Sequence, residues 1–188
     1  MSAIRPLIET VCDEVQQCLG AISSPSLDEA TSEISKARRV FLIGAGRSGL
    51  CIRGCAMRLM HMGKTVHVVG DVTTPAIGEG DLLIVGSGSG TTASLVTAAQ
   101  KAKQLGARIL LITINPASLI GRLADAVVRV PAPSPKAVEA EATIRSVQPM
   151  GSLFEQCLFL LLDVLVMLQM HEHSVTSADM FVRHANLE

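Results

Sequence analysis

A predicted strand that ends in a run of small hydroxyl residues is the feature that most constrains the fold of this chain. Residues 81–92 read DLLIVGSGSGTT, in which four apolar residues are followed by alternating glycines and serines. An apolar pattern with helical spacing begins directly afterwards and continues to Ala102. Such a strand-to-helix turn leaves the first backbone N–H groups of the helix without partners, at the positive end of the helix dipole.

This turn is therefore a predicted phosphate-binding loop. Its glycines allow the backbone to approach a ligand closely, and its hydroxyl groups can donate to phosphate oxygens without adding charge. The hydroxyl groups belong to Ser87, Ser89, Thr91 and Thr92. The alternative is an ordinary turn with a Ser or Thr cap, but the hydroxyls and glycines between residues 86 and 92 exceed what a cap requires.

Strand and helix patterns alternate through the middle of the chain. We expect strands at 40–43, 65–69, 82–85, 108–114 and 126–130, and helices at 47–61, 92–105 and, shorter, near 117–123. Strands rich in Val, Ile and Leu that alternate with helices predict an α/β fold with a parallel sheet covered on both faces. The predicted fold is a three-layer sandwich around a five-stranded sheet with the strand order 2-1-3-4-5.

The two ends of the chain are predicted to be helical. Residues 4–19 form an amphipathic pattern, and a second helix is expected from Ser26, which has capping-box spacing to Glu29. Prolines after residue 130 predict an irregular loop before a long apolar helix at 151–170. The predicted organisation is a single domain over 1–188, in four parts. These are N-terminal helices at 1–37, an α/β core at 38–130, a loop at 131–150, and C-terminal helices with a tail at 151–188.

The helix at 151–170 is apolar on every side, so both of its sides should be covered. Glu155, Gln156 and Asp163 interrupt the apolar run, and we therefore expect a core helix and no membrane span. The sheet can cover only one side of it. The other side is predicted to lie in a subunit interface of a homo-oligomer, together with the N-terminal helix.

A second glycine loop, GAGRSG at residues 44–49, follows the first predicted strand. The pattern matches the dinucleotide-binding fingerprint, and Asp71 lies where a ribose-binding acid could be. In the expected strand order, however, this loop and the loop at 86–92 border one crevice. Two small anion-binding loops suit one compact phosphorylated molecule better than an extended dinucleotide, with Gly46, Arg47 and Ser48 as predicted contacts.

Composition excludes several classes of function. A net charge of -1 and the lack of Trp and Tyr argue against nucleic-acid binding. The five cysteines have no C-x-x-C spacing, so neither a zinc site nor a disulfide framework is predicted, and no metal or cofactor is expected. Reduced thiols and an N-terminus without a continuous apolar segment favour a cytoplasmic protein.

Several motifs together resemble the sugar isomerase (SIS) domain, and within it the 6-phospho-3-hexuloisomerase family. They are GAGRSG, SGSGTT, MRLMHMG, PMGSLFEQ and RHANLE. The resemblance implies a flavodoxin-like fold, a homotetramer, and interconversion of D-arabino-3-hexulose 6-phosphate and D-fructose 6-phosphate without a cofactor. It also implies a place in the ribulose monophosphate pathway of formaldehyde assimilation or detoxification, with 3-hexulose-6-phosphate synthase as a pathway partner. Thr91 departs from the family pattern, which often has an acid there.

An isomerase of this kind needs a base that moves a proton between C2 and C3 through an enediolate. Glu155 is the candidate, and the resemblance supports it. Its alternative is a capping box with Ser152, which has the matching spacing. His61, in MRLMHMG, and His184, in RHANLE, are secondary catalytic candidates through the resemblance, although His61 could instead be a helix-terminal cation and His184 part of a solvated tail.

Two other classes of function remain open from the sequence. One is a nucleotide-dependent oxidoreductase built on GAGRSG, which the second phosphate loop disfavours. The other is a non-catalytic sugar-phosphate sensor, because SIS domains also occur in transcription factors. Only 39 residues precede Val40, however, and their pattern is amphipathic and not that of a basic DNA-binding domain.

Overall fold

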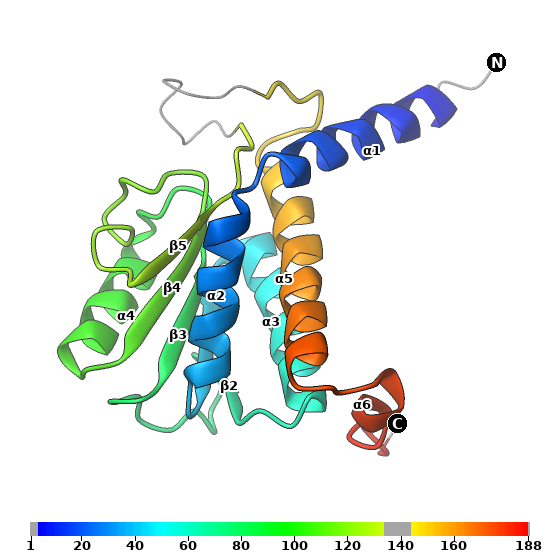
Figure 1. Cartoon of the computed structure of the whole chain (residues 1–188). Helices are drawn as coiled ribbons and strands as arrows, with labels where there is room; N and C mark the ends of the chain where they lie inside the picture. The colour runs from blue at the N-terminus through cyan, green and yellow to red at the C-terminus, as the bar shows by residue number, and fades with distance from the viewer. Residues whose placement is uncertain (1–3, 134–143, 188) are drawn as a thin grey trace.

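The computed structural model describes residues 4–133 and 144–187 (Figure 1). Within these residues the helices are α1 (Ile4–Gly20), α2 (Ser24–Lys36), α3 (Gly46–His61), α4 (Ala93–Gln104), α5 (Ser152–Glu172) and α6 (Ser177–Phe181). The strands are β1 (Val40–Gly44), β2 (Val66–Val68), β3 (Leu82–Gly86), β4 (Arg108–Thr113) and β5 (Ala126–Arg129). All the strands expected from the apolar pattern are present, with ends that differ by at most one residue.

The described strands form one parallel sheet in the order β2-β1-β3-β4-β5. This confirms the α/β class and the predicted 2-1-3-4-5 order. In the register between the two central neighbours, Val40 lies opposite Leu82 and Gly44 opposite Gly86. The carboxyl ends of β1 and β3 are therefore level, and the loops that follow them start side by side.

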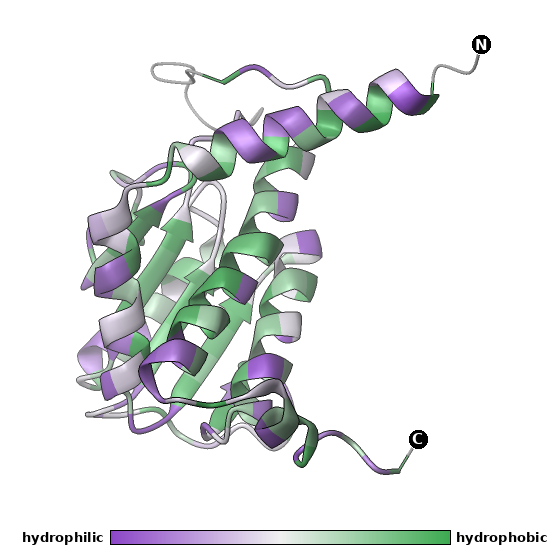
Figure 2. Cartoon of the chain, turned by 45° about the vertical axis from the view of Figure 1, so that its right-hand side comes forward, coloured by the Kyte–Doolittle hydropathy of each residue, from purple (hydrophilic) through white to green (hydrophobic). Residues whose placement is uncertain are grey.

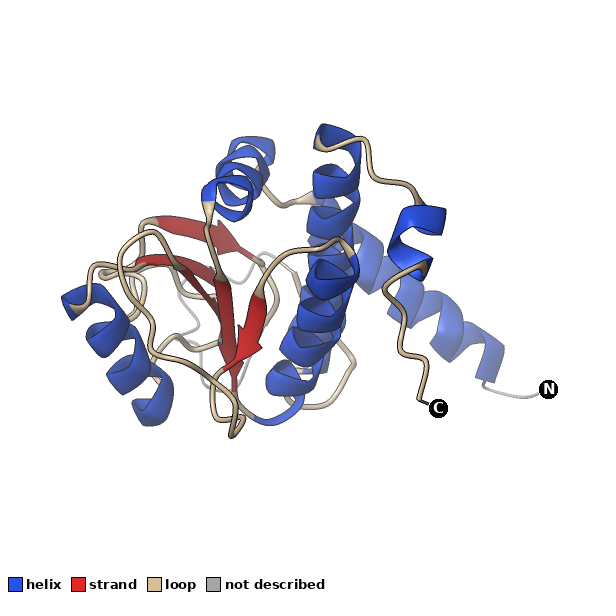
Figure 3. Cartoon of the chain, turned by 90° about the horizontal axis from the view of Figure 1, so that it is seen from below, coloured by secondary structure: helices blue, strands red, loops and turns tan. Residues whose placement is uncertain are grey.

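Helices cover both faces of the sheet and make three layers (Figure 3). Alternate strand residues such as Leu42 and Ile84 point into a core shared with α2, α3 and α5. The intervening residues, such as Phe41 and Leu83, point into a second core under α4. The central strands β1, β3 and β4 are buried on both faces, and their sequences are accordingly nearly continuous apolar runs, as in parallel sheets.

The start of α2 differs from the prediction. The helix begins at Ser24 with Ser23 as its N-cap, so the expected capping box between Ser26 and Glu29 is wrong. Pro25 lies in the first turn, where its fixed φ angle suits a helix and its missing N–H costs no bond. The Ser26 hydroxyl instead donates back to the Ser23 carbonyl at 2.7 Å.

Two short segments also differ from the prediction. The expected helix near 117–123 is a series of turns, held to the serine-rich loop because the Ile120 N–H donates to the Gly90 carbonyl at 3.1 Å. α6 lies within the region predicted to hold C-terminal helices and a tail, but its bounds were not predicted. It starts with a complete capping box between Thr176 and Asp179, and this spacing could have predicted the helix.

α5 is covered on one side only. By length and composition it is the one described helix that could span a membrane. The expectation that its polar residues exclude a span is therefore wrong. Half of its most apolar window is nevertheless buried against the rest of the fold, as in core helices of soluble proteins. Its outer side is apolar as well (Figure 2). The exposed large residues there are Phe159, Leu160, Val164, Met167 and Leu168.

Several ion pairs lie at the amino-terminal ends of the strands. Asp81, directly before β3, is fully buried, and its carboxylate accepts hydrogen bonds from Arg39 at 2.6 and 3.0 Å and from the Gly78 N–H at 2.9 Å. Burial raises the pKa of Asp81, but the bonds from Arg39 and Gly78 outweigh it and the pKa is lowered overall. Asp81 is therefore ionised at neutral pH and ties the loop before β3 to the start of β1.

We predict that Asp81→Asn lowers the free energy of unfolding by about 2–3 kcal/mol at pH 7, the scale of a buried hydrogen bond to a charge. Because the pKa of Asp81 is depressed in the folded protein, the wild-type advantage should be constant at neutral pH and disappear as the pH falls below about 4. Urea denaturation followed by circular dichroism at several pH values measures this. Asp71→Asn, at an exposed ion pair with Arg53, is the control and should change little. An equal loss in both variants would contradict the prediction.

Candidate functional site

Two glycine loops meet at the carboxyl ends of β1 and β3. Since Gly44 lies opposite Gly86, residues 44–49 and 86–92 start from neighbouring positions. α3 then leaves toward one face of the sheet and α4 toward the other. This is the topological switch point at which open α/β sheets bind their ligands.

The glycines of the first loop allow β1 and α3 to approach each other. A Cβ at Gly49 would come within 2.8 Å of the Gly44 carbonyl oxygen, and Gly46 has a φ of +57°, which favours glycine. The N-cap of α3 is Ala45, and within the described chain no side-chain hydrogen bond caps this end of the helix. Its first N–H groups are therefore available to a ligand.

The second loop is organised by its own serine hydroxyls. The Gly90 N–H donates to the buried Ser87 hydroxyl at 3.2 Å, and the Thr91 N–H donates to Ser89 at 3.3 Å. A hydroxyl that accepts in this way still has its own proton to donate. Thr92 is the N-cap of α4 and, within the described chain, makes no side-chain bond to it. The loop therefore presents hydroxyl and amide donors, as its sequence predicts.

The first turn of α5 touches both loops. Glu155 Oε2 lies 2.9 Å from Arg47 Nε in the first loop, and a Cβ at Gly88 in the second loop would lie 3.3 Å from the Phe154 ring. The Glu155 side chain is 19% exposed. Its expected alternative role in a capping box with Ser152 is wrong, because Gly151 is the N-cap and no side-chain bond caps the described helix. The carboxylate is instead directed at Arg47.

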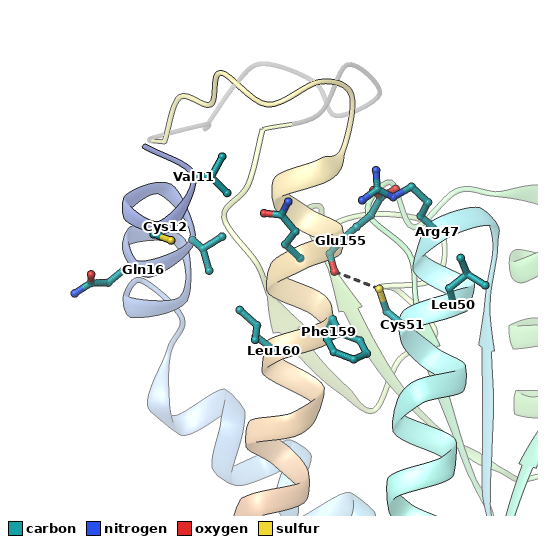
Figure 4. Close-up of a pocket in the computed structure, with 11 residues that line it drawn as sticks. Val11, Cys12, Gln16, Arg47, Leu50, Cys51, Glu155, Phe159 and Leu160 are labelled. Carbon is teal, nitrogen blue, oxygen red and sulfur yellow. Dashed lines mark hydrogen bonds and ion pairs between the residues drawn. The ribbon is translucent and has the colours of Figure 1, made fainter. Parts of the chain in front are cut away.

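An apolar groove of about 640 Å³ starts at this ion pair and runs between α1, α3 and α5 (Figure 4). Apart from the charged pair and two glutamines, its walls are apolar or thiol side chains. These are Val11, Cys12, Val15, Leu50, Cys51, Phe159 and Leu160. None of the serines or threonines of the second loop lines it. The groove therefore fits an apolar protein segment better than a phosphorylated sugar, and only its charged end belongs to the candidate site.

His61 and His184 lie together at the other end of α3. Their rings are 5.4 Å apart and stacked, and His61 is 3% exposed. Burial, followed by the charges of Arg58 and His184, lowers the pKa of His61, which disfavours the interpretation as a helix-terminal cation. His61 lies 14 residues after Arg47 on α3, which places the histidine pair about 21 Å from Arg47 along the helix axis. One chain thus brings the two histidines to each other but not to Glu155.

The remaining alternatives have little support in the described residues. Asp71, the expected ribose-binding acid, pairs with Arg53 at 2.8 Å. Between residues 4 and 133 and between 144 and 187, no group of three His, Cys, Asp or Glu side chains could hold a metal ion.

Known proteins with similar sequence and structure point to one family. A family model of the SIS domain matches residues 33–160. A Bacillus subtilis protein named 3-hexulose-6-phosphate isomerase is 44% identical over 181 residues, which span 96% of this chain and 97% of the relative. A Mycobacterium gastri protein of the same name is 46% identical, over 96% of this chain and 89% of its own. A solved structure from Methanococcus jannaschii, for which a 3-hexulose-6-phosphate isomerase function was inferred, has a TM-score of 0.83 and 30% identity and covers 97% of this chain and 99% of its own.

Proposed function

The chain belongs to the SIS-domain family, among its 3-hexulose-6-phosphate isomerases, and from this premise we propose which of its residues carry out the isomerisation. The reaction interconverts D-arabino-3-hexulose 6-phosphate and D-fructose 6-phosphate. One observation carries the assignment of residues: the first turn of α5 contacts both glycine loops at the switch point. A carboxylate and two groups of phosphate donors therefore surround one site.

Glu155 is proposed as the base. In the direction of fructose 6-phosphate it takes the proton from C2, which leaves an enediolate across C2 and C3. The proton returns to C3, and a proton moves from the C2 oxygen to the C3 oxygen, so that the carbonyl is now at C2. No net oxidation occurs, and the carboxylate is regenerated at the end of each cycle.

The phosphate is proposed to bind at the two loops, with contacts from Gly46, Arg47 and Ser48 in the first. In the second loop the proposed contacts are Ser87, Ser89, Thr91 and Thr92. Arg47 is 63% exposed, and ion pairs with so much solvent contribute only about 0–1 kcal/mol. An incoming phosphate can therefore draw Arg47 from Glu155 at little cost, and the base is then free to accept a proton.

A second copy of the chain is proposed to complete the site. The outer sides of α1 and α5 are apolar and exposed, including Ile4 and Leu7 at 66% and 57% and Met167 at 64%. A monomer with such a surface would be unusual for a soluble protein. A homo-oligomer covers it, and a neighbouring subunit could bring its His61 and His184 to this Glu155, where they would help to move the oxygen-bound proton. The resemblance implies a tetramer.

The cellular setting is also a proposal. All five cysteines lie in the described residues and are free thiols, which supports a reducing cytoplasm. There the enzyme would act after 3-hexulose-6-phosphate synthase in the ribulose monophosphate pathway.

Ser89→Ala tests the phosphate site. If the Ser89 hydroxyl donates to the phosphate in the ground state and the transition state alike, its loss should raise KM about tenfold or more and change kcat much less. Steady-state kinetics with fructose 6-phosphate measures both constants. The control is Thr97→Ala, one turn after the start of α4. The Thr97 hydroxyl donates to the Ala93 carbonyl, and its loss should leave KM unchanged. An unchanged KM with a collapsed kcat in Ser89→Ala would move the phosphate site elsewhere.

Glu155→Gln tests the base. We expect near-normal thermal stability, because only the ion pair with the largely exposed Arg47 is lost. Binding of the phosphosugar should persist, while exchange of the C2 proton with solvent deuterium, followed by NMR, should fall by about 10²–10⁴. Asp163→Asn makes the same chemical change two turns further along α5 and should leave exchange intact. A folded Glu155→Gln variant that still exchanges the proton would falsify the assignment.

Mixing two variants tests the shared site. Glu155→Gln and His184→Gln should each be impaired as pure oligomers, and mixed oligomers should recover activity, because some sites then combine an intact Glu155 with an intact His184. With equal mixing about one quarter of the sites are restored if each site spans two chains. Sedimentation would verify that mixed assemblies form. Mixing Glu155→Gln with Ser89→Ala, whose altered residues belong to the same half-site, is the control. Full activity of His184→Gln, or no recovery in mixed oligomers, would contradict a shared site.

A further inference from the structure

A buried carboxylate on α1 holds the segment that leads into α5. Glu14 is 8% exposed, and its carboxylate accepts three hydrogen bonds from consecutive residues. The donors are the Ser146 hydroxyl at 2.7 Å, the Val147 N–H at 2.7 Å and the Gln148 side-chain amide at 2.9 Å. No ion pair of Glu14 with a cation occurs in the described part of the chain. Three neutral donors therefore hold one buried negative charge.

The bonds are strong enough to keep Glu14 ionised. Burial raises the pKa of this carboxyl, but the hydrogen bonds from Ser146, Gln148 and Val147 outweigh it, and the pKa is lowered overall. A carboxylate that accepts several bonds from neutral donors binds them more tightly than a neutral oxygen would. The segment is thus attached to α1 more firmly than an ordinary surface loop.

The attached segment has no regular structure of its own. Residues 144–147 form neither helix nor strand, although the Gln148 N–H donates to the Ser146 hydroxyl at 3.0 Å. A tight turn follows, in which Met150 has a φ of +59°, an unfavourable value for a residue other than glycine. The Ser152 N–H then donates to the Pro149 carbonyl, and α5 begins. The path from the bonds of Glu14 to Glu155 is therefore short and constrained.

α1 is also packed on α5 itself, which makes Glu14 part of a closed arrangement. Cys18, one helical turn after Glu14 and on the same face, is completely buried in the core that contains Cys157 of α5. Figure 1 shows the segment before α5, in yellow, running close to α1 and entering the top of α5. Both the body of α5 and the chain entering it are thereby fixed to the same helix.

We propose that Glu14 is a positioning residue for the isomerisation: by holding residues 146–148 on α1, it fixes the first turn of α5 and thereby the place of the Glu155 carboxylate. The inference rests on the proposed role of Glu155 as base. Glu14 does not line the groove next to Glu155, and it acts only through the segment. Since proton transfer depends steeply on geometry, a displacement of the turn by about 1 Å can cost up to 10²-fold in rate.

The test compares Glu14→Gln with Glu9→Gln. The amide introduced by Glu14→Gln would keep one acceptor oxygen but turn an NH₂ group toward donors, so at least one bond is lost. We expect kcat to fall about tenfold, with KM for fructose 6-phosphate changed less than about threefold, since the phosphate loops lie on other elements. Glu9, on the same helix, is exposed and paired with Arg5, and its variant should retain wild-type kcat and KM. Urea denaturation verifies that both variants are fully folded under the assay conditions.

Ser146→Ala provides the second measurement. If Glu14 acts through the segment, Ser146→Ala should lower kcat by a smaller factor, and the double variant should lose less than the product of the two single losses. Wild-type kcat in Glu14→Gln, a rise in KM equal to the fall in kcat, or strictly multiplicative losses would each overturn the proposal.

Glu155→Gln, assayed alongside, separates this inference from the proposed function. Lost C2-proton exchange in Glu155→Gln together with normal kcat in Glu14→Gln would overturn the positioning role alone. Retained exchange in Glu155→Gln would overturn the base assignment and, with it, the target on which Glu14 is proposed to act.

Discussion

The close approach of helices to the carboxyl ends of β1 and β3 is the constraint on which the rest of the structure depends. Gly86 ends β3, and a Cβ there would lie within 2.8 Å of Ile52 on α3 and 3.1 Å of Leu158 on α5. Gly44 and Gly49 are equally close to each other. Only glycine at these positions lets α3 and α5 lie directly over the strand ends. Because of this packing, the first turn of α5 reaches both loops, and the Glu155 carboxylate lies beside Arg47 of the first loop.

α5 also connects the fold to assembly. Its inner residues, including Leu158, Leu161 and Leu165, fill the core over the sheet. Its outer residues are equally apolar, and the structure of one chain leaves them in water. α1 has the same property, since its first half extends away from the body with Ile4, Leu7 and Ile8 exposed (Figure 1). One long helix thus supplies part of the core, the proposed base Glu155 and an exposed apolar surface.

Much of the fold could be predicted from the sequence because its signals are local and strong. Apolar runs bounded by glycine predicted the strands, and the alternation with helices predicted their parallel order. Capping boxes were less reliable in both directions. The spacing at Ser26 and Ser152 occurs without the hydrogen bonds, because Ser23 and Gly151 are the N-caps, whereas the complete capping box lies at Thr176 and Asp179.

The contacts that assemble the site are the part that sequence patterns could not predict. The ion pair between Arg47 and Glu155 joins residues far apart in the chain, and neither its partner nor its geometry follows from a motif. The carboxylate of Glu14 looked like one polar residue on an amphipathic helix, and its donors lie more than 130 residues away. The separation of about 21 Å between Arg47 and His61 follows from the continuous helix that the sequence predicted, whereas the stacking of His61 on His184 followed from no motif.

Charged side chains are distributed differently at the amino edge of the sheet, where the strands begin, and at the carboxyl edge, where they end. This distribution agrees with an anionic ligand. At the amino edge, acids are buried or partly buried in pairs with bases, as in Asp81 with Arg39 and Asp125 with Lys103. At the carboxyl edge, the loops at 44–49 and 86–92 contain no acid, and Arg47 is their single charge. Neutral hydroxyls and amides bind a phosphate without a fixed counter-charge. The Glu155 carboxylate comes from a separate helix, α5, and is paired with Arg47 of the first loop.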